Sequence, residues 1–257
     1  MNKFKSIFLI INLKTIIVTV LAVVSTCLCI TYDITADFPL TLIATAIIFP
    51  IVFSIGGAYK RRESVLNDYG TIKAHGRAIY FAVRDWMDEP CEESLQKCRD
   101  LLGNMLGACR TLFTESNVAM RENEDEVYRS FSELSRFIRT DLREKGLASG
   151  EVSRCNQFLS KICVAFDHIK HINQYRTPRS LRAFSDFFVV ILPPLYGPYF
   201  ALAAKDQAMW LAYVIPILFS VVLVSLGNIQ EHLEDPFDQV GADDVVINVE
   251  LFVKRLD

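Results

Sequence analysis

The sequence lacks the short motifs that mark most enzymes and metal proteins. Its seven cysteines form no CxxC pair, and it has no glycine-rich phosphate loop, no nucleophile elbow and no paired-carboxylate motif in an apolar stretch. His168 and His171 lie one helical turn apart beside Asp167, but no Cys, Glu or third His completes a recognisable ligand set. We therefore expect no enzyme activity, no metal and no cofactor.

The cysteine count is odd, which argues against a complete disulfide framework. Cys27 and Cys29 fall in an apolar stretch, and the other five fall in a charged segment that we assign below to the cytoplasm, where thiols stay reduced. We expect the cysteines to act as small buried hydrophobes.

Charge is missing from four long stretches of the chain, which raise its hydrophobic content to 51% and its mean hydropathy to +0.26. Each has about the 20 residues that a helix needs to cross the bilayer core, and without water a spanning backbone must close its own hydrogen bonds. The first lacks a small-x-small cleavage site and is followed at once by another apolar run, so we expect it to be retained. The predicted membrane spans are Thr15–Tyr32, Phe38–Tyr59, Phe187–Ala204 and Gln207–Gln230.

Positive charge is scarce in the two short turns between these spans. The Asp33–Asp37 loop has no Lys or Arg and the Lys205–Asp206 turn has one, whereas 21 of the 27 Lys and Arg lie between Lys60 and Arg182. The positive-inside rule therefore predicts that both termini and the large middle segment are cytoplasmic. The middle segment also holds 16 acids between Glu63 and Glu144, so we expect no nucleic-acid partner.

The middle segment has little proline and no alternating strand pattern, and its apolar residues recur at three and four. One helix is predicted to run on from the second span to Trp86, with Gly76 on its apolar face, where we expect the glycine to allow a close helix contact. Gly146 is predicted to be the C′ residue of the helix over Glu122–Lys145. Three further helices are predicted near Cys91–Leu106, Glu122–Lys145 and Glu151–Gln174. The fold is therefore all-α, with the segments 1–59, 60–183, 184–230 and 231–257.

One stripe stands out in the second span. Thr41, Thr45, Phe49 and Phe53 recur every four residues and so lie along one helix face. By itself the pattern is typical of helix packing or of a lipid-facing surface. Pro50 lies within this segment and is expected to remove one backbone hydrogen bond from the helix.

The third span contains "LPPLYGP" (192–198), which predicts a broken helix. Such a break persists in a membrane only where protein or water satisfies the freed carbonyls. At the cytoplasmic entrance of the same span, Arg182 and Asp186 are four residues apart and are predicted to pair.

Three patches of the sequence resemble the bestrophin family. The stretch "FPIVFSIGGAYKRRESVLNDYG" (49–70) is similar to the end of the second span in bacterial bestrophins, and "ILPPLYG" (191–197) resembles the family's Leu-Leu-Pro-Phe-Gly. The segment "IQEHLEDPFDQVGADDVVINVELFVKRL" is similar to the bacterial Glu-Leu-Glu-Asp-Pro-Phe-Gly region with its terminal amphipathic helix. The residues that fit the family motifs are Ala58, Tyr59, Arg61, Tyr69 and Gly70 in the first patch, and Leu233, Glu234, Asp235, Pro236 and Phe237 in the last.

Bestrophins are pentameric ion channels, so the resemblance implies a homopentamer in a bacterial inner membrane, in contact with lipid. Five second spans would surround an axis, and counting back from the motif Arg61 places Thr45, Phe49 and Phe53 in the hydrophobic neck. The resemblance further places Arg179 at the cytoplasmic aperture, where five Arg would favour anions such as chloride; the alternative is that Arg179 is only a positive-inside flank. A sodium or potassium channel of the same fold, and a non-conducting membrane-anchored sensor or scaffold, remain alternatives.

Animal bestrophins carry a run of acids after Pro-Phe that holds calcium. Here the window has only Asp238, Asp243 and Asp244, split by Val-Gly-Ala, and acids spaced in this way do not make a calcium cage of about 6–8 oxygens, so we expect no calcium gating. We expect the acids near Glu234 to face the Lys60–Arg62 or the Arg176–Arg182 cluster, and the last helix to cover Val245–Leu256.

Overall fold

The computed structural model describes residues 10–87, 91–115, 120–175, 178–206, 208–237 and 244–256, with the side chains of Leu40, Arg179 and Asp206 left aside. In these ranges the regular elements are all helical, as predicted. The chain divides into two compact units, which are described separately. Unit 1 comprises Met1–Lys60, Arg176–Asp235 and Val240–Asp244, and unit 2 comprises Arg61–Tyr175, Pro236–Gln239 and Val245–Asp257.

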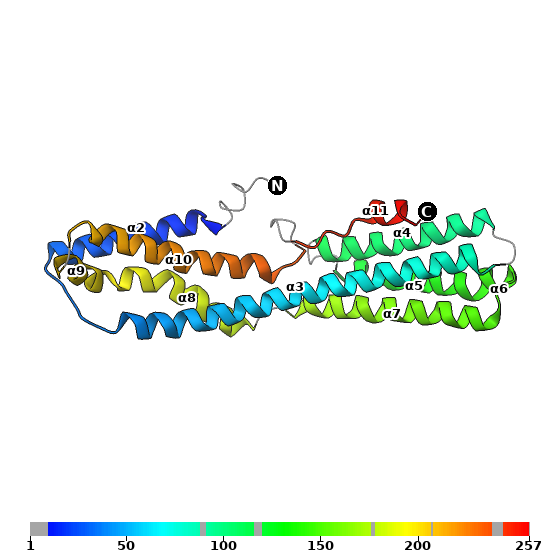
Figure 1. The fold of residues 1–257 in the computed structure, drawn as a ribbon, viewed down its shortest axis with the longest axis horizontal. Helices are drawn as coiled ribbons and strands as arrows, with labels where there is room; N and C mark the ends of the chain where they lie inside the picture. The colour runs from blue at the N-terminus through cyan, green and yellow to red at the C-terminus, as the bar shows by residue number, and fades with distance from the viewer. Residues whose placement is uncertain are drawn as a thin grey trace. The chain divides into compact units, whose positions relative to one another are not determined.

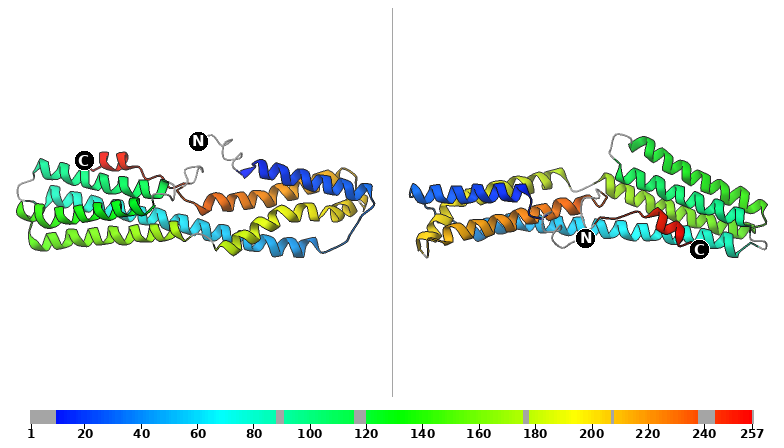
Figure 2. Two further views of the ribbon diagram at one scale, coloured as in Figure 1. Left: turned by 180° about the vertical axis from the view of Figure 1, so that it is seen from behind. Right: turned by 90° about the horizontal axis from the view of Figure 1, so that it is seen from above.

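Unit 1 contains the helices that are long and apolar enough to cross a membrane, and the prediction of four spans is confirmed by length and composition. Helices α2 and α10 lie side by side, and α8 and α9 pack against both (Figures 1 and 2). Their shared core includes Val18, Ile51, Leu192, Phe200 and Val224. The bounds are α2 Leu13–Thr31, α8 Arg179–Leu195, α9 Gly197–Asp206 and α10 Leu211–Glu234.

Helix α3, Leu40–Asp85, is one continuous helix of 46 residues (Figure 1). Its residues up to Lys60 belong to unit 1, and its residues from Arg61 onward belong to unit 2. Pro50 lies inside it without ending it. The predicted run of the second span into the middle segment is therefore confirmed.

The third span is broken, as the proline-rich stretch predicts. Helix α8 ends at Leu195 and α9 begins at Gly197, with Tyr196 between them. Pro198 has no amide hydrogen to give to the carbonyl of Pro194, and the hydroxyl of Ser25 in α2 donates to that carbonyl instead at 2.7 Å. The freed backbone group is thus satisfied by a neighbouring helix.

Unit 2 is a bundle of the second part of α3 with α4, α5 and α7, completed by short helical pieces (Figure 1). The predicted single helix over Glu122–Lys145 is wrong in one respect, because a π-helical turn interrupts it at Phe137–Asp141. Gly146 has a φ of +97° after the end of this helix, so its predicted place is confirmed. The bounds are α4 Glu92–Thr114, α5 Met120–Arg136, α6 Leu142–Glu144, α7 Ser149–Gln174 and α11 Val249–Lys254.

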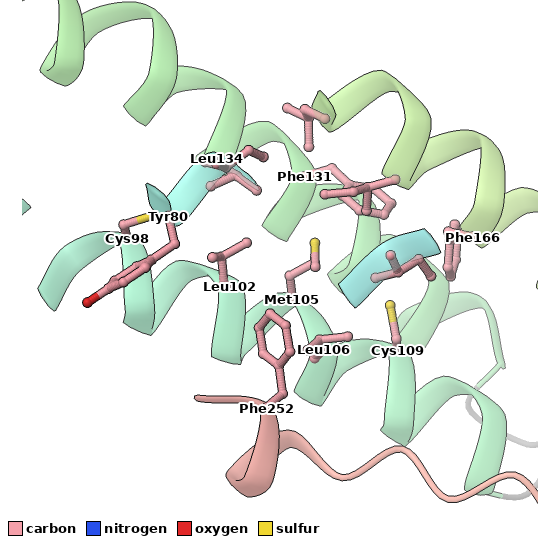
Figure 3. Close-up of a cluster of buried hydrophobic side chains, with 14 of the residues drawn as sticks. Tyr80, Cys98, Leu102, Met105, Leu106, Cys109, Phe131, Leu134, Phe166 and Phe252 are labelled. Carbon is pink, nitrogen blue, oxygen red and sulfur yellow. The ribbon is translucent and has the colours of Figure 1, made fainter. Parts of the chain in front are cut away.

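One apolar core holds unit 2 together. Figure 3 shows Leu102 and Met105 of α4 meeting side chains from α5 and α7, while Phe252 points into the same cluster from α11. Gly76 makes this approach possible, because a Cβ there would lie 3.3 Å from the Phe252 ring. The predicted role of Gly76 in a close contact is confirmed.

The predicted last helix is wrong at both ends. Residues Val245–Asn248 are not helical, and α11 begins only at Val249, with the Asn248 side chain accepting a hydrogen bond of 2.7 Å from the amide of Leu251. Val245 and Ile247 are buried while Val246 between them is exposed. This alternation is that of extended backbone, and it agrees with the low helix propensity of the β-branched residues Val245, Val246 and Ile247.

Candidate functional site: an exposed aromatic face on α3

The stripe predicted from its four-residue spacing lies on one exposed face of α3. Phe49 is 60% and Phe53 66% exposed, and Thr45 is exposed one turn before them. The two phenyl rings meet edge to face, with centroids 4.8 Å apart. Large exposed aromatic side chains indicate a surface that contacts lipid, a partner or the lumen of a pore.

The opposite face of the same segment is buried in unit 1. Its residues are small or aliphatic and recur at three and four: Ala44, Ile47, Ile51, Ser54 and Ala58. This burial fixes the rotation of α3 within unit 1, and so fixes the direction of the stripe away from that unit's core.

Exposure alone does not single out the stripe. Helix α2 also exposes a row of aliphatic residues, including Ile16, Val20 and Val24. The α3 face differs in carrying an aromatic ladder with a hydroxyl-bearing residue at one end. It also carries exposed Tyr59 and Gly56, and a Cβ built at Gly56 meets nothing within 4 Å among the described residues.

A polar network ties α8 to α10 at one end of unit 1. Arg182 pairs with Glu234, with 3.0 Å between nitrogen and oxygen, and with Asp186 at 3.8 Å. The Gln230 amide donates to Glu234 at 3.0 Å, and Ser185 donates to Gln230 at 3.2 Å. Two predictions are confirmed here: Arg182 pairs with Asp186, and Glu234 faces the Arg176–Arg182 cluster.

The Pro-Phe motif marks a change of environment along the chain. Helix α10 ends at Glu234 and Asp235 caps it, in keeping with the bias against helix before a proline. Phe237 is buried in the core of unit 2, where its ring stacks on Phe113 with centroids 4.9 Å apart. The carbonyl of Pro236 accepts a hydrogen bond of 2.7 Å from Val245. The motif therefore anchors the terminal segment.

The other motif residues are placed as follows. Tyr59 is exposed in unit 1, and Arg61 is half-buried in unit 2. Arg179 begins α8, and its side chain lies outside the described part of the structure. The window Asp238–Asp243 also lies outside the described residues, so the expectation about calcium stays a prediction.

His168, His171 and the neighbouring Asp167 each contact another side chain. The Nδ1 of His168 lies 3.8 Å from Asp68, Asp167 pairs with Lys170 at 3.2 Å, and the His171 ring packs on Tyr175. Among the described residues no group of three or more His, Cys, Asp or Glu could hold a metal ion.

One polar contact within the spans was missed by sequence reasoning. The Asn228 amide of α10 donates to the carbonyl of Ile10 at 2.6 Å and to the hydroxyl of Thr15 at 3.2 Å. A lone asparagine inside an apolar run is the signal that could have revealed it, because a buried amide needs a partner. Lys14 and Asp186 form a second unpredicted pair, at 3.6 Å.

Comparison with known proteins adds a likeness at the level of structure. No protein-family model and no curated protein matches the chain. A solved variant of a bacterial bestrophin homolog from Klebsiella pneumoniae superposes with a TM-score of 0.76 at 20% identity, covering 95% of this chain and 99% of that one.

Two further structures agree with this match. A second variant of the Klebsiella pneumoniae protein gives a TM-score of 0.73 at 19% identity and covers 98% of this chain and 97% of that one. A crystal structure described only as a membrane protein gives 0.77 at 18% identity, over 95% and 98%. The chain therefore has, over almost its whole length, the fold of the bacterial bestrophin homolog.

Proposed function

We propose that the protein is a homopentameric ion channel of bestrophin type. The single observation that carries the proposal is the exposed ladder of Thr45, Phe49 and Phe53 on α3. Five copies of this face around an axis would form a narrow apolar neck, which controls ion flow by dewetting. The full-length likeness to the bacterial bestrophin homolog supports the same arrangement.

In this proposal the spans of unit 1 cross a bacterial inner membrane and contact its lipid. Both termini and residues 60–183 are cytoplasmic, which the distribution of Lys and Arg supports. Residues 231–257 then return the chain to the cytoplasmic part, and the burial of Phe237 in unit 2 supports this. Tyr59 and Arg61 follow the neck on α3, while Glu234, Asp235 and Pro236 end the fourth span.

The preferred permeant ion in this proposal is chloride or another small anion. Its support is Arg179, which begins α8 and would place five positive charges at the cytoplasmic aperture. The neck itself is uncharged and selects little by sign, so a sodium or potassium channel is the alternative.

Two measurements test the proposal. Images of the solubilised complex should show five-fold symmetry, and its mass should be five times that of the 29.2 kDa chain. Planar-bilayer recordings under a tenfold chloride gradient should reverse toward the chloride potential, about 59 mV for a monovalent ion. Reversal toward the cation potential would replace the anion assignment. A pentamer without current would instead favour a membrane-anchored scaffold, in which the phenylalanine ladder is packing.

A further inference from the structure

A groove in unit 2 carries charge of one sign only. It has a volume of about 430 Å³ and lies between α3 and the terminal segment around α11. Lys73 and Arg77 line it from α3, and Arg255 lines it from just after α11. On α3 the lining recurs at three and four, as Gly70, Lys73, Ala74 and Arg77, so one helix face forms that wall. The lining residues that the structure describes include no acid.

Other grooves of unit 2 differ in this respect. The groove between α4 and α5 is lined by Arg99 and Arg110 but also by Asp100, Glu126 and Glu133. Another, near Phe137, combines basic residues with Glu133 and Asp141. Mixed lining of this kind neutralises itself, whereas the charged residues in the described lining of the α3 groove are all positive.

The three cations of the α3 groove make no ion pair with an acid among the described residues, in contrast to cations elsewhere in unit 2. Arg84 pairs with Asp85 at 2.7 Å, and Arg110 pairs with Glu250 at 2.9 Å. The contact that Lys73 makes is with an aromatic face, since its ammonium lies 4.2 Å from the centre of the Tyr69 ring. Like charges gathered without acids repel one another, and a bound anion would relieve this repulsion.

The walls of the groove are held by the core. Tyr69 is buried, and the ring of Phe252 reaches into the cluster of α4 side chains (Figure 3). The Asn248 side chain is engaged in capping α11 and accepts from Leu251. Exposed Val246 and Leu251 add an apolar side. The polar chemistry offered to a ligand is thus that of cationic donors on a fixed frame.

We propose that this groove binds a multivalent anion that carries phosphate groups, either free in solution or as a lipid headgroup. Two guanidinium forks match the oxygen geometry of phosphate, and an ammonium adds a point charge. A single chloride ion would need neither three cations nor a groove of this volume. The ligand would hold the terminal segment against α3, the same helix that carries Phe49 and Phe53.

The test uses pyrophosphate as the probe on the full-length protein in detergent, at constant ionic strength. Ligand that binds only the folded state raises its stability. Pyrophosphate should raise the unfolding midpoint saturably, and chloride at matched ionic strength should not. The double variant Arg77→Gln with Arg255→Gln should weaken pyrophosphate binding, measured by calorimetry, at least about tenfold. Arg84→Gln, which removes a paired cation of the same unit, should leave the affinity unchanged.

A second arm separates the two sources of phosphate. The protein is placed in nanodiscs of phosphatidylcholine with or without phosphatidic acid, whose headgroup is a phosphate monoester. If the natural ligand is a lipid, phosphatidic acid should raise the midpoint of the wild type and not that of the double variant. If the ligand is free, only pyrophosphate should do so.

Equal midpoint shifts in the wild type and the double variant would overturn the proposal, as would the absence of any saturable shift in both arms. Lys73→Gln offers an independent check if the double variant is poorly folded by circular dichroism, and it should weaken binding in the same direction. None of these readouts uses ionic current, so the anion groove and the channel proposal can fail separately.

Discussion

The guanidinium of Arg182 in α8 donates a hydrogen bond of 3.0 Å to the carboxylate of Glu234 in α10, whose side chain is only 3% exposed. The same carboxylate accepts from Gln230 at 3.0 Å. A buried carboxylate needs such partners, because burial without them is costly. This pair joins the third and fourth spans next to the Pro-Phe motif.

Replacing Glu234 should therefore destabilise the protein more than replacing the nearby exposed Glu231. We expect Glu234→Ala to lower the free energy of unfolding by about 2 kcal/mol, because the buried Gln230 amide loses its acceptor and the partly exposed Arg182 loses a charged partner. Glu231 lies 3.4 Å from Arg182 in an exposed position, so Glu231→Ala should cost less than about 0.5 kcal/mol. Thermal unfolding in detergent measures both, and equal midpoints for the two variants would contradict the assignment.

The break in the third span should be sensitive to a single methyl group. A Cβ at Gly197 would lie 2.4 Å from the Ser25 hydroxyl oxygen and 3.1 Å from the Ser25 backbone. Because the backbone of α2 cannot move aside cheaply, Gly197→Ala should destabilise unit 1 by about 1–3 kcal/mol.

The control is Gly107→Ala in α4, where an added Cβ meets nothing within 4 Å. It should be neutral or stabilise by up to about 1 kcal/mol through helix propensity. Should the Gly197 variant unfold at the wild-type temperature, the close contact between α2 and the break would be wrong.

The cysteines should differ sharply in reactivity. Hydrogen bonds from the backbone of Ser94 and Glu93 at the start of α4, with a smaller contribution from Lys145, lower the pKa of the half-buried Cys91 thiol. Burial raises the pKa of Cys98 to about 12 and that of Cys155 to about 11. A lowered pKa means more thiolate at neutral pH, and the thiolate is the nucleophile.

When the folded protein is treated with iodoacetamide at pH 7, Cys91 should be labelled before Cys98 and Cys155. Mass spectrometry measures the labelling of each cysteine. Lys145→Ala should slow the labelling of Cys91. Labelling of Cys98 at the rate of Cys91 without unfolding would show that the core of unit 2 is not closed as described.

Calcium removal should leave the proposed current unchanged. In the window after the Pro-Phe motif, Asp238 is separated from Asp243 and Asp244 by a stretch with Val-Gly-Ala, and this spacing does not make a cage of about 6–8 oxygens for calcium. Recordings before and after addition of a chelator test this, and loss of current on chelation would show that a calcium site exists.

Periodicity was sufficient to predict most helices of this fold. The spans follow from the lack of charge, and the break at Tyr196 follows from prolines that cannot donate hydrogen bonds. The π-helical turn at Phe137–Asp141 could not be predicted, because Leu134, Ile138 and Leu142 keep regular spacing through it.

The terminal segment shows where an apolar run was mistaken for the start of a helix. Val245, Val246 and Ile247 are β-branched, which disfavours a helix, and Asn248 is a good capping residue, so both sequence signals of a later helix start were present. The direction of the α3 stripe within unit 1 follows from its spacing, whereas the surroundings of Phe49 and Phe53 in the proposed pentamer would come from other copies of the chain.

The effect of Phe49→Ala on single-channel current tests the central claim most directly. The matched control is Phe187→Ala, a phenylalanine of α8 that is exposed to a similar degree. In planar bilayers the wild type should conduct, Phe49→Ala should raise conductance or open probability because a wider neck dewets less, and Phe187→Ala should behave as the wild type, with all three remaining pentamers. Pentamers that carry no current, or a Phe49→Ala variant that only loses stability, would contradict the channel.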